Sequence, residues 1–232
     1  MPADIARLGL LQAFSLRIGG THVRLPASAQ RLLAFLALQR EPVPRSSVAA
    51  VLWPDATTDH AGGSLRSVLW RLGRIHRRGL VVCGEELRLA DDVDVDVVRA
   101  WASATELLDG AAPDQVLADD LAHDILPDWD CEWVRVERDR FRQARLHALE
   151  MLSWQLAGQE RYGEAVGAAM VAVAADPLRE TAHRALIGAF LAEGNHGQAL
   201  DQYRVCHRLF RDGLGMPPSP ALETLIAPAL HD

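Results

Sequence analysis

The chain has 232 residues, of which 49% are hydrophobic and 24% are charged, and its formal net charge is −7. This composition is close to the globular average and excludes a wholly disordered chain, while the length suffices for one large domain or two small ones. All 24 basic residues are Arg, which we attribute to a coding bias rather than to function.

The first 25 residues have the pattern of short β-strands. Apolar and polar residues alternate in part over 7–10, 14–18 and 22–25. The pair Gly19-Gly20, which separates the last two segments, predicts a tight hairpin.

Three helices are predicted next. Apolar residues at helical spacing indicate a first helix at 28–39 that is capped by its own first residue, and the Pro-containing segment 41–44 ends it. A second helix at 46–52 is capped by Ser46 or Ser47, and a third helix runs from about residue 58 to residue 76.

A second hairpin is predicted after these helices. The segments 80–83 and 86–89 flank a Gly84-Glu85 turn. Strands, three helices and a hairpin in this order are typical of a winged helix-turn-helix.

The acidic stretch DDVDVDV at 91–97 alternates like a strand, and its last Asp is placed to cap a helix at about 97–108. It lacks the spacing, the Gly and the terminal Glu of a calcium-binding loop. We interpret it as a solvated linker with carboxylates at a helix start, and we predict no metal site.

From Trp129 onward the pattern is helical, beginning with a long amphipathic segment at 131–156. Further helices are expected at 162–175, 179–192, 197–211 and 220–226. The motif GEAV at 163–166 recurs as GQAL after 34 residues, the period of tetratricopeptide repeats. Repeats of this kind bury their faces on one another and form scaffolds for protein–protein contacts.

The charge is divided unevenly along the chain. Residues 1–90 hold 12 Arg and 6 acidic residues, whereas residues 91–232 hold 12 Arg and 25 acidic residues. This asymmetry indicates a basic nucleic-acid-binding module joined to an acidic partner-binding module. We therefore predict a mainly α-helical fold with a small β component, consisting of a winged-helix DNA-binding domain at 1–92 and a helical domain at 93–232.

No targeting or membrane-spanning pattern is present in the sequence. The N-terminus lacks a signal-peptide pattern, and no run of about 18 apolar residues occurs. Cys83, Cys131 and Cys206 form no CxxC pair, so we interpret them as small buried apolar residues. We predict a cytoplasmic protein with no membrane contact and no cofactor.

The third predicted helix has an apolar stripe on one side and a polar, Arg-rich opposite side. The candidate DNA-binding residues of this helix are Ser64, Arg66, Ser67, Trp70, Arg71, Arg74 and Arg77. Guanidinium groups can clamp phosphates or contact guanine edges in a bidentate manner. Arg45 and Ser46 at the start of the second helix, and Arg88 on the wing, are further candidates for phosphate contacts. The alternative is an Arg-rich solvated face.

The sequence resembles the SARP-type transcriptional activators, the antibiotic-pathway regulatory proteins of actinomycetes. The segments that resemble their OmpR-like winged helix are RLGLLQAFSLRIGG, LLAFLALQREPVPRSSVAAVLWPD and SLRSVLWRL. Those that resemble their bacterial transcriptional activator domain, built from tetratricopeptide-like helices, are LPDWDCEWVRVERDRFRQARLHALE, AADPLRETAHRALIGAFLAEGN and QALDQYRVCHRLFRDGLGMPPSPAL.

The resemblance implies a function and a set of partners. Proteins of this family bind direct repeats of double-stranded DNA at promoters and recruit RNA polymerase, through its sigma factor and other subunits, to secondary-metabolite gene clusters. By position, Ser67 and Arg71 face the bases, and Trp53, Asp55 and Thr58 lie in or beside the loop that touches polymerase. Self-association on DNA and a nucleoid-associated location are also implied.

Other functions are compatible with the same architecture. A winged helix does not by itself set the sign of regulation, so a transcriptional repressor is one alternative. A protein-interaction module that does not bind DNA is another. Salt-dependent binding to duplex DNA distinguishes a DNA-binding regulator from such a module. No HExxH, GxSxG or P-loop motif is present, and we expect no enzymatic activity.

Overall fold

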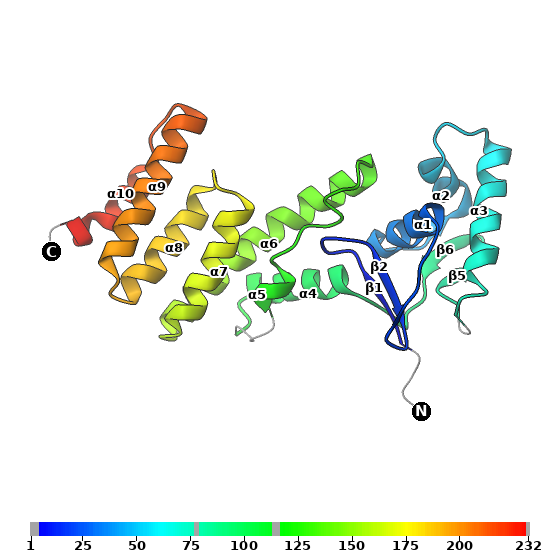
Figure 1. The fold of residues 1–232 in the computed structure, drawn as a ribbon, viewed down its shortest axis with the longest axis horizontal. Coiled ribbons are helices and arrows are strands. Elements are labelled where there is room, and N and C mark those ends of the chain that lie inside the picture. Colours follow the sequence, from blue (N-terminus) through cyan, green and yellow to red (C-terminus); the bar gives the residue numbers. More distant parts are fainter. Residues whose placement is uncertain (1–4, 77–78, 113–116, 231–232) are drawn as a thin grey trace. The chain divides into compact units, whose positions relative to one another are not determined.

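The computed structural model describes residues 5–76, 79–112 and 117–230. The described residues divide into two compact units (Figure 1). The first unit is drawn from Met1–Arg99 and Asp124–Asp139, and the second from Ala100–His123 and Arg140–Asp232. The fold is mainly helical, as predicted, with its strands in the first unit.

A four-stranded sheet begins the first unit. Its strands are β1 (Ala6–Gly9), β2 (Ser15–Ile18), β3 (Thr21–His22) and β7 (Val93–Val95), in the spatial order β3-β2-β1-β7. Strand β1 runs antiparallel to β2 and parallel to β7. Gly19 and Gly20 connect β2 to β3 with φ angles of 54° and 85°, which glycine adopts without strain. The predicted hairpin is therefore confirmed.

The acidic stretch after the wing is part of the fold, and its interpretation as a solvated linker is wrong. Strand β7 pairs with β1, and Asp96 is the first residue of α4 (Asp96–Leu108). The Asp96 carboxylate accepts hydrogen bonds from the backbone N–H groups of Leu10, at 2.9 Å, and Leu11, at 3.0 Å. The first compact unit thus extends beyond residue 92, while the predicted division into domains stays a prediction.

The helix-turn-helix consists of α1 (Ala27–Leu38), α2 (Arg45–Leu52) and α3 (Thr58–Leu72). The wing consists of β5 (Val81–Cys83) and β6 (Glu86–Leu89), and β4 (Val43–Pro44) adds a third strand in the order β4-β6-β5. This arrangement confirms the predicted winged helix.

The helix ends differ from those predicted. Pro26 and Pro44 are the N-caps of α1 and α2, so Ser28, Ser46 and Ser47 do not cap these helices. Both prolines hold an extended conformation immediately before the helix, which fixes its first turn. Helix α3 ends at Leu72, four residues earlier than predicted, because the next residue is Gly73, and glycine is a poor helix former. Gly73 is the C-cap of α3.

A later segment of the chain completes the core of the first unit. The Gln12 N–H donates to the Asp124 carbonyl oxygen at 2.8 Å, and Leu11 forms a β-bridge with Ile125. The rings of Phe14 and Trp129 stack with centroids 6.1 Å apart. This segment is held in place because the Arg138 Nε donates to the carbonyl oxygen of Ile125 at 2.7 Å.

The second unit is a stack of antiparallel helices. Its elements are the part of α4 from residue 100, α5 (Leu117–Asp120), the part of α6 (Glu132–Gly158) from residue 140, α7 (Tyr162–Ala175), α8 (Glu180–Ala192), α9 (His196–Leu214), α10 (Pro220–Ile226) and a 3-10 turn (Ala227–Leu230). Ala165 of α7 and Ala199 of α9 occupy equivalent places in the 34-residue repeat, and both are fully buried. The predicted helices are confirmed.

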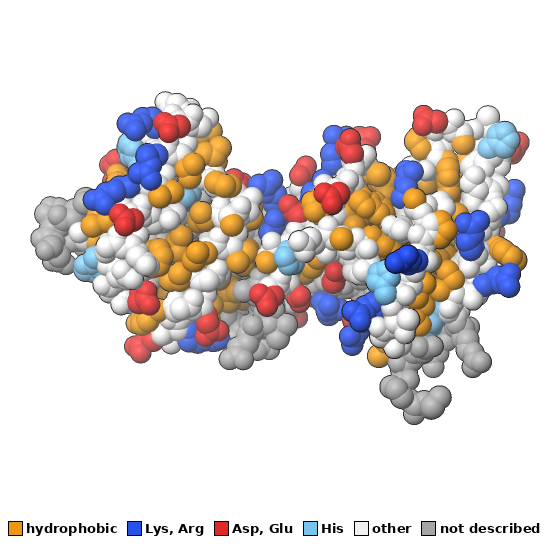
Figure 2. All heavy atoms as spheres, viewed as in Figure 1, with side chains coloured by type: hydrophobic (Ala, Val, Ile, Leu, Met, Phe, Trp, Pro, Cys, Tyr) orange, Lys and Arg blue, Asp and Glu red, His pale blue; other side chains and the backbone are white. Residues whose placement is uncertain are grey.

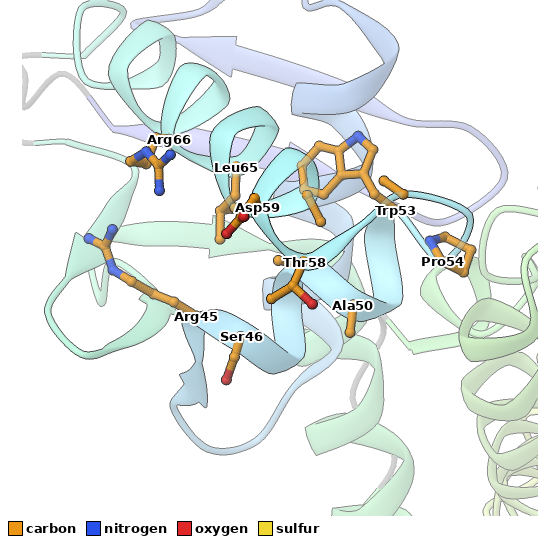
Figure 3. Close-up of a pocket in the computed structure, with 13 residues that line it drawn as sticks. Arg45, Ser46, Ala50, Trp53, Pro54, Thr58, Asp59, Leu65 and Arg66 are labelled. Carbon is orange, nitrogen blue, oxygen red and sulfur yellow. The ribbon is translucent and has the colours of Figure 1, made fainter.

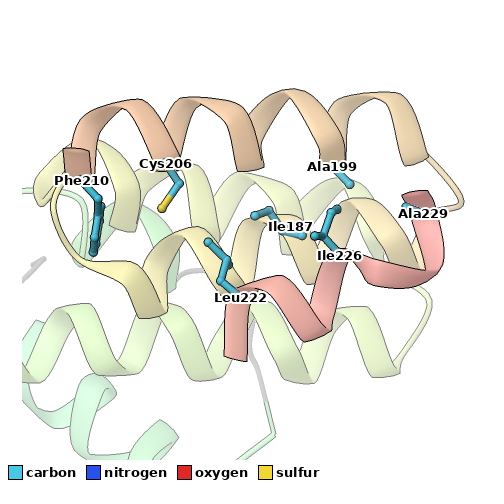
Figure 4. Packing of buried hydrophobic residues seen from close by; sticks show 7 residues of the cluster. All are labelled: Ile187, Ala199, Cys206, Phe210, Leu222, Ile226 and Ala229. Atoms are coloured by element: carbon cyan, nitrogen blue, oxygen red, sulfur yellow. The ribbon is translucent and has the colours of Figure 1, made fainter. Parts of the chain in front are cut away.

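The core at the C-terminal end of the second unit joins α8, α9 and α10 (Figure 4). Its buried members are Ile187, Ala199, Cys206, Phe210, Leu222, Ile226 and Ala229. Burial raises the pKa of the Cys206 thiol to about 12, so this cysteine behaves as the small apolar residue that was predicted. The interpretation as a buried residue is wrong for Cys83, which is exposed on the wing because the short strand β5 leaves it outside the core, and Cys131 is half-buried.

His183 is a buried polar residue within this helical stack. Its Nε2 lies 2.9 Å from the Pro177 carbonyl oxygen, and its Nδ1 lies 2.8 Å from the Gln202 side-chain amide nitrogen. A neutral imidazole satisfies both contacts, since Nε2–H donates to the carbonyl and Nδ1 accepts from the amide.

In the part of the chain that the structure describes, none of the helices has the length and the apolar composition that a membrane span requires.

Asp96→Ala should destabilise the first unit by about 2 kcal/mol, because it leaves the N–H groups of Leu10 and Leu11 without their charged acceptor. Urea denaturation measures the loss. Asp128→Ala is the matched control, since Asp128 is exposed. Equal unfolding free energies for the two variants would contradict the role given to Asp96.

The free energy of unfolding should fall as the pH drops below about 6.5, because burial lowers the pKa of His183 in the folded chain. In that window the unfolded chain binds a proton that the folded chain excludes, at a cost of up to about 1.4 kcal/mol per pH unit. Urea denaturation between about pH 7.5 and pH 5 should show a weaker pH dependence for His183→Gln. His123→Gln, at an exposed histidine without a hydrogen-bond or ion-pair partner among the described residues, should retain the native slope. A native slope in His183→Gln would argue against this assignment.

Candidate nucleic-acid interface

Helix α3 presents one apolar and one polar side, as its sequence predicts. Ala61, Leu65, Val68 and Leu72 are buried against the rest of the first unit. The opposite side exposes Arg66, Ser67, Trp70 and Arg71, and Ser64 is half-buried at its margin. The structure therefore places five of the seven DNA-binding candidates predicted for this helix on one side of α3.

Two consecutive glycines shape the first half of this surface. The Arg66 guanidinium lies 3.6 Å from the position that a Cβ atom would occupy on Gly62, and 3.7 Å from the corresponding position on Gly63. Each glycine costs about 1 kcal/mol within a helix relative to alanine. Because these glycines have no side chain, the Arg66 guanidinium can lie close to the backbone of α3.

A hollow of about 560 Å³ lies between α2 and α3 (Figure 3). Arg45 and Arg66 lie toward one end of it, and Trp53 and Pro54 lie toward the other. Ser46, Thr58 and Asp59 also line it. The hollow thus combines residues predicted to bind DNA with residues predicted to touch polymerase.

Arg45 also fixes the position of the wing. Its Nε donates to the Gly84 carbonyl oxygen at 2.7 Å. The Arg45 backbone N–H also donates to the Glu85 carbonyl oxygen, at 3.2 Å. Two hydrogen bonds therefore join the N-terminus of α2 to the turn between β5 and β6, and the Arg45 guanidinium stays partly exposed beside Ser46.

A second hollow, of about 520 Å³, lies along another side of α3. Its lining includes Ser64, Ser67 and Arg71. Ser67 donates its hydroxyl hydrogen to the Gly63 carbonyl oxygen at 3.0 Å. Trp53 lines both hollows, so this residue supports the DNA-binding candidates as well as the loop that follows α2.

Trp70 is the most exposed large apolar side chain of the described residues, with 66% of its surface accessible. Arg74 lies beyond the end of α3, and its Cζ is 4.9 Å from the centroid of the Trp70 ring. The prediction that Arg74 lies on the helix is therefore wrong, since Gly73 ends α3 before it. A cation–π contact nevertheless keeps Arg74 beside the exposed face.

The remaining predicted residues are placed differently. Arg88 on β6 forms an ion pair with Asp91 and lines a separate hollow beside the end of α1, so the structure does not group it with α3. Arg77 lies outside the described residues. Asp55 is exposed in the loop between α2 and α3, and Thr58 is exposed at the start of α3.

The charge of the exposed face is only partly compensated. Arg66 and Arg71 have no hydrogen-bond or ion-pair partner within the described part of the chain. Unpaired guanidinium groups on one helix face can bind phosphate oxygens or guanine edges without first breaking an ion pair.

In the described ranges, no group of three or more His, Cys, Asp or Glu side chains is placed to hold a metal ion.

Sequence reasoning missed two residues of this surface, Asp59 and His60. Asp59 lines both hollows, and His60 lines the second. The His60 Nδ1 lies 3.1 Å from the Thr57 hydroxyl oxygen, next to the start of α3. Helical spacing contained the signal, because Asp59 precedes Arg66 by two turns and lies on the same side.

The fold and this surface define a winged-helix transcriptional regulator with a helical second part. Residues 82–229 match the family model of the bacterial transcriptional activator domain, and the chain belongs to this family. The resemblance to SARP-type activators is thereby confirmed.

One known protein is similar to this chain in sequence, and one solved structure is similar to it in fold. The chain is 29% identical over 213 residues to the regulatory protein AfsR of Streptomyces coelicolor, an alignment that covers 86% of this chain and 21% of AfsR. The chain thus spans about a fifth of that relative's length. Its fold is similar to that of Mycobacterium tuberculosis EmbR, solved in complex with a low-affinity phosphopeptide. The TM-score is 0.72 at 21% identity, over 97% of this chain and 65% of the EmbR chain.

Proposed function

We propose that this regulator is a sequence-specific DNA-binding activator. It binds direct repeats at promoters of a secondary-metabolite gene cluster, and it recruits RNA polymerase there. Such a protein acts in the cytoplasm, associated with the nucleoid. It needs no catalytic group, since its effect comes from binding alone.

The exposed face of α3 is the observation that carries this proposal. It combines the unpaired Arg66 and Arg71 with small residues near its centre. The major groove of B-DNA is about 12 Å wide and admits an α-helix. Gly63 and Ser67 allow such a helix to lie deep in the groove, which brings the guanidinium groups within reach of base edges.

The start of α2 supports a second set of contacts. We expect Arg45 and Ser46 to bind a phosphate through the guanidinium group, the hydroxyl group and the backbone N–H groups that follow Arg45 in the first helical turn. Because Arg45 is bonded to the wing turn, a phosphate bound there also orients the wing.

Recruitment of polymerase is assigned to the loop between α2 and α3. Trp53, Asp55 and Thr58 present an aromatic, an acidic and a hydroxyl side chain within six residues. The sigma factor and other polymerase subunits are the partners that family membership suggests. Direct repeats place two protomers head to tail, so self-association would occur on the DNA.

Fluorescence anisotropy with a duplex from the promoter next to the gene tests the proposal. Affinity should fall steeply between about 50 and 200 mM salt, because phosphate contacts release counterions. An absence of binding at low salt would exclude a DNA-binding regulator and would favour the alternative of a protein-interaction module. Binding that lowers transcription by purified polymerase would indicate a repressor.

Arg71→Ala should cost about 1–3 kcal/mol of binding to the specific duplex and far less on an unrelated duplex, since it removes a base contact. Arg45→Ala should weaken binding to both duplexes and reduce the salt slope by about 1. Arg208→Ala, on α9, removes the same charge from an exposed site of the second unit and is the control. Unchanged affinity in Arg71→Ala would remove this residue from the interface.

Asp55→Ala should reduce transcription from the promoter while the affinity for DNA is unchanged, because Asp55 is exposed and lines neither hollow beside α3. Trp53→Ala should lower both, because Trp53 lines both hollows. Anisotropy and transcription with purified polymerase measure the two effects. If Asp55→Ala weakened DNA binding as much as it weakened transcription, the polymerase contact would be ruled out.

A further inference from the structure

The outer face of the four-stranded sheet carries a line of basic side chains, here called the basic row and consisting of His22, Arg17 and Arg7. Arg17 lies directly opposite His22 on β3 and directly opposite Arg7 on β1. All three residues are exposed. Neighbouring strands are about 4.8 Å apart, so the row spans about 10 Å. Figure 2 shows arginine and histidine side chains gathered over the area where Figure 1 draws β1 and β2.

This arrangement is unfavourable for the isolated sheet. Like charges that face each other across two antiparallel strands destabilise the pair. Asp94 on β7 lies opposite Arg7, with its carboxylate 3.7 Å from the Arg7 Nε, but it also forms an ion pair with Arg99. Arg17 donates to the Gly20 carbonyl oxygen at 3.0 Å, which orients its guanidinium without neutralising it.

Repulsion between neighbouring side chains that is not offset by better packing of the fold is a sign of an interaction surface. The apolar residues of the same strands, Leu8 and Leu16, are fully buried and already supply the packing of this sheet. The basic row adds nothing to that core. Its charges therefore favour binding of an anionic partner on the exposed side.

We propose that the basic row binds an acidic α-helix of a partner protein. Carboxylates at positions i, i+4 and i+7 of a helix recur about every 5–6 Å, close to the spacing of the three strands. A helix lying across β1, β2 and β3 can thus place one carboxylate opposite each basic side chain. This surface is additional to the DNA-binding face.

The same duplex does not serve both surfaces. Within the first unit, Figure 1 shows α1 between the strands β1 and β2 on one side and α3 on the other. A straight duplex lying along α3 therefore leaves the outer face of the sheet free. This separation favours a protein partner over the phosphate backbone.

A labelled helical peptide tests the inference. The probe is an alanine-based peptide with glutamates at i, i+4 and i+7 on one face, and the matched peptide carries glutamines at those positions. Fluorescence anisotropy at low salt should show binding of the acidic peptide to the full chain. The double variant Arg7→Gln/Arg17→Gln should bind it about tenfold more weakly. Arg208→Gln/Arg211→Gln removes the same charge from α9 and should bind normally.

Two further measurements separate this role from others. The melting temperature of Arg7→Gln/Arg17→Gln should equal or exceed that of the native chain, because the opposed charges are gone. Its affinity for duplex DNA should be unchanged. The proposal is overturned by equal binding of the two peptides, by native peptide affinity in the double variant, by a lower melting temperature, or by a loss of DNA affinity.

Discussion

The hydrogen bonds of the Asp96 carboxylate hold together parts of the first unit that are 85 residues apart. They fix the chain where it leaves β1, and β1 is the strand to which both β2 and β7 pair. The sheet thus includes a strand, β7, that follows the wing in the sequence. A fragment that ended at residue 92 would leave the N–H groups of Leu10 and Leu11 without this acceptor. The winged helix thus depends on residues that follow it in the sequence.

Patterns that act over a few residues predicted most of the fold. The apolar stripe of α3, the Gly19-Gly20 turn and the 34-residue repeat all depend on neighbours within one or two elements, and all are confirmed. The contacts of Asp96 and the packing of Trp129 could not be predicted, because their partners lie far away in the sequence. The helix ends were missed for a different reason, since proline caps and serine caps compete within a few residues.

The candidate interface, too, could be predicted only in part from the sequence. Helical spacing placed Arg66 and Arg71 on the exposed face, but it did not show that Arg88 is paired with Asp91. Nor did it show that Trp53 lines the hollows on two sides of α3. A residue in this position supports DNA contacts and the polymerase loop at once. Variants of Trp53 therefore cannot separate the two roles, whereas variants of the exposed Asp55 can.

The total charge of −7 describes neither of the surfaces that we infer. At physiological ionic strength, interactions between exposed charges fall off over about 8 Å, so each surface acts through its own side chains. On α3, Gly62 and Gly63 leave room for the Arg66 guanidinium, and Arg66 and Arg71 do not face each other across a strand pair. In the basic row, Arg7 and Arg17 face each other across two strands, which costs stability until an anion is bound. The two surfaces should therefore respond differently to loss of charge. Removing arginines from α3 weakens binding and relieves no repulsion within the fold, whereas removing Arg7 and Arg17 from the basic row weakens binding and also relieves the repulsion between them.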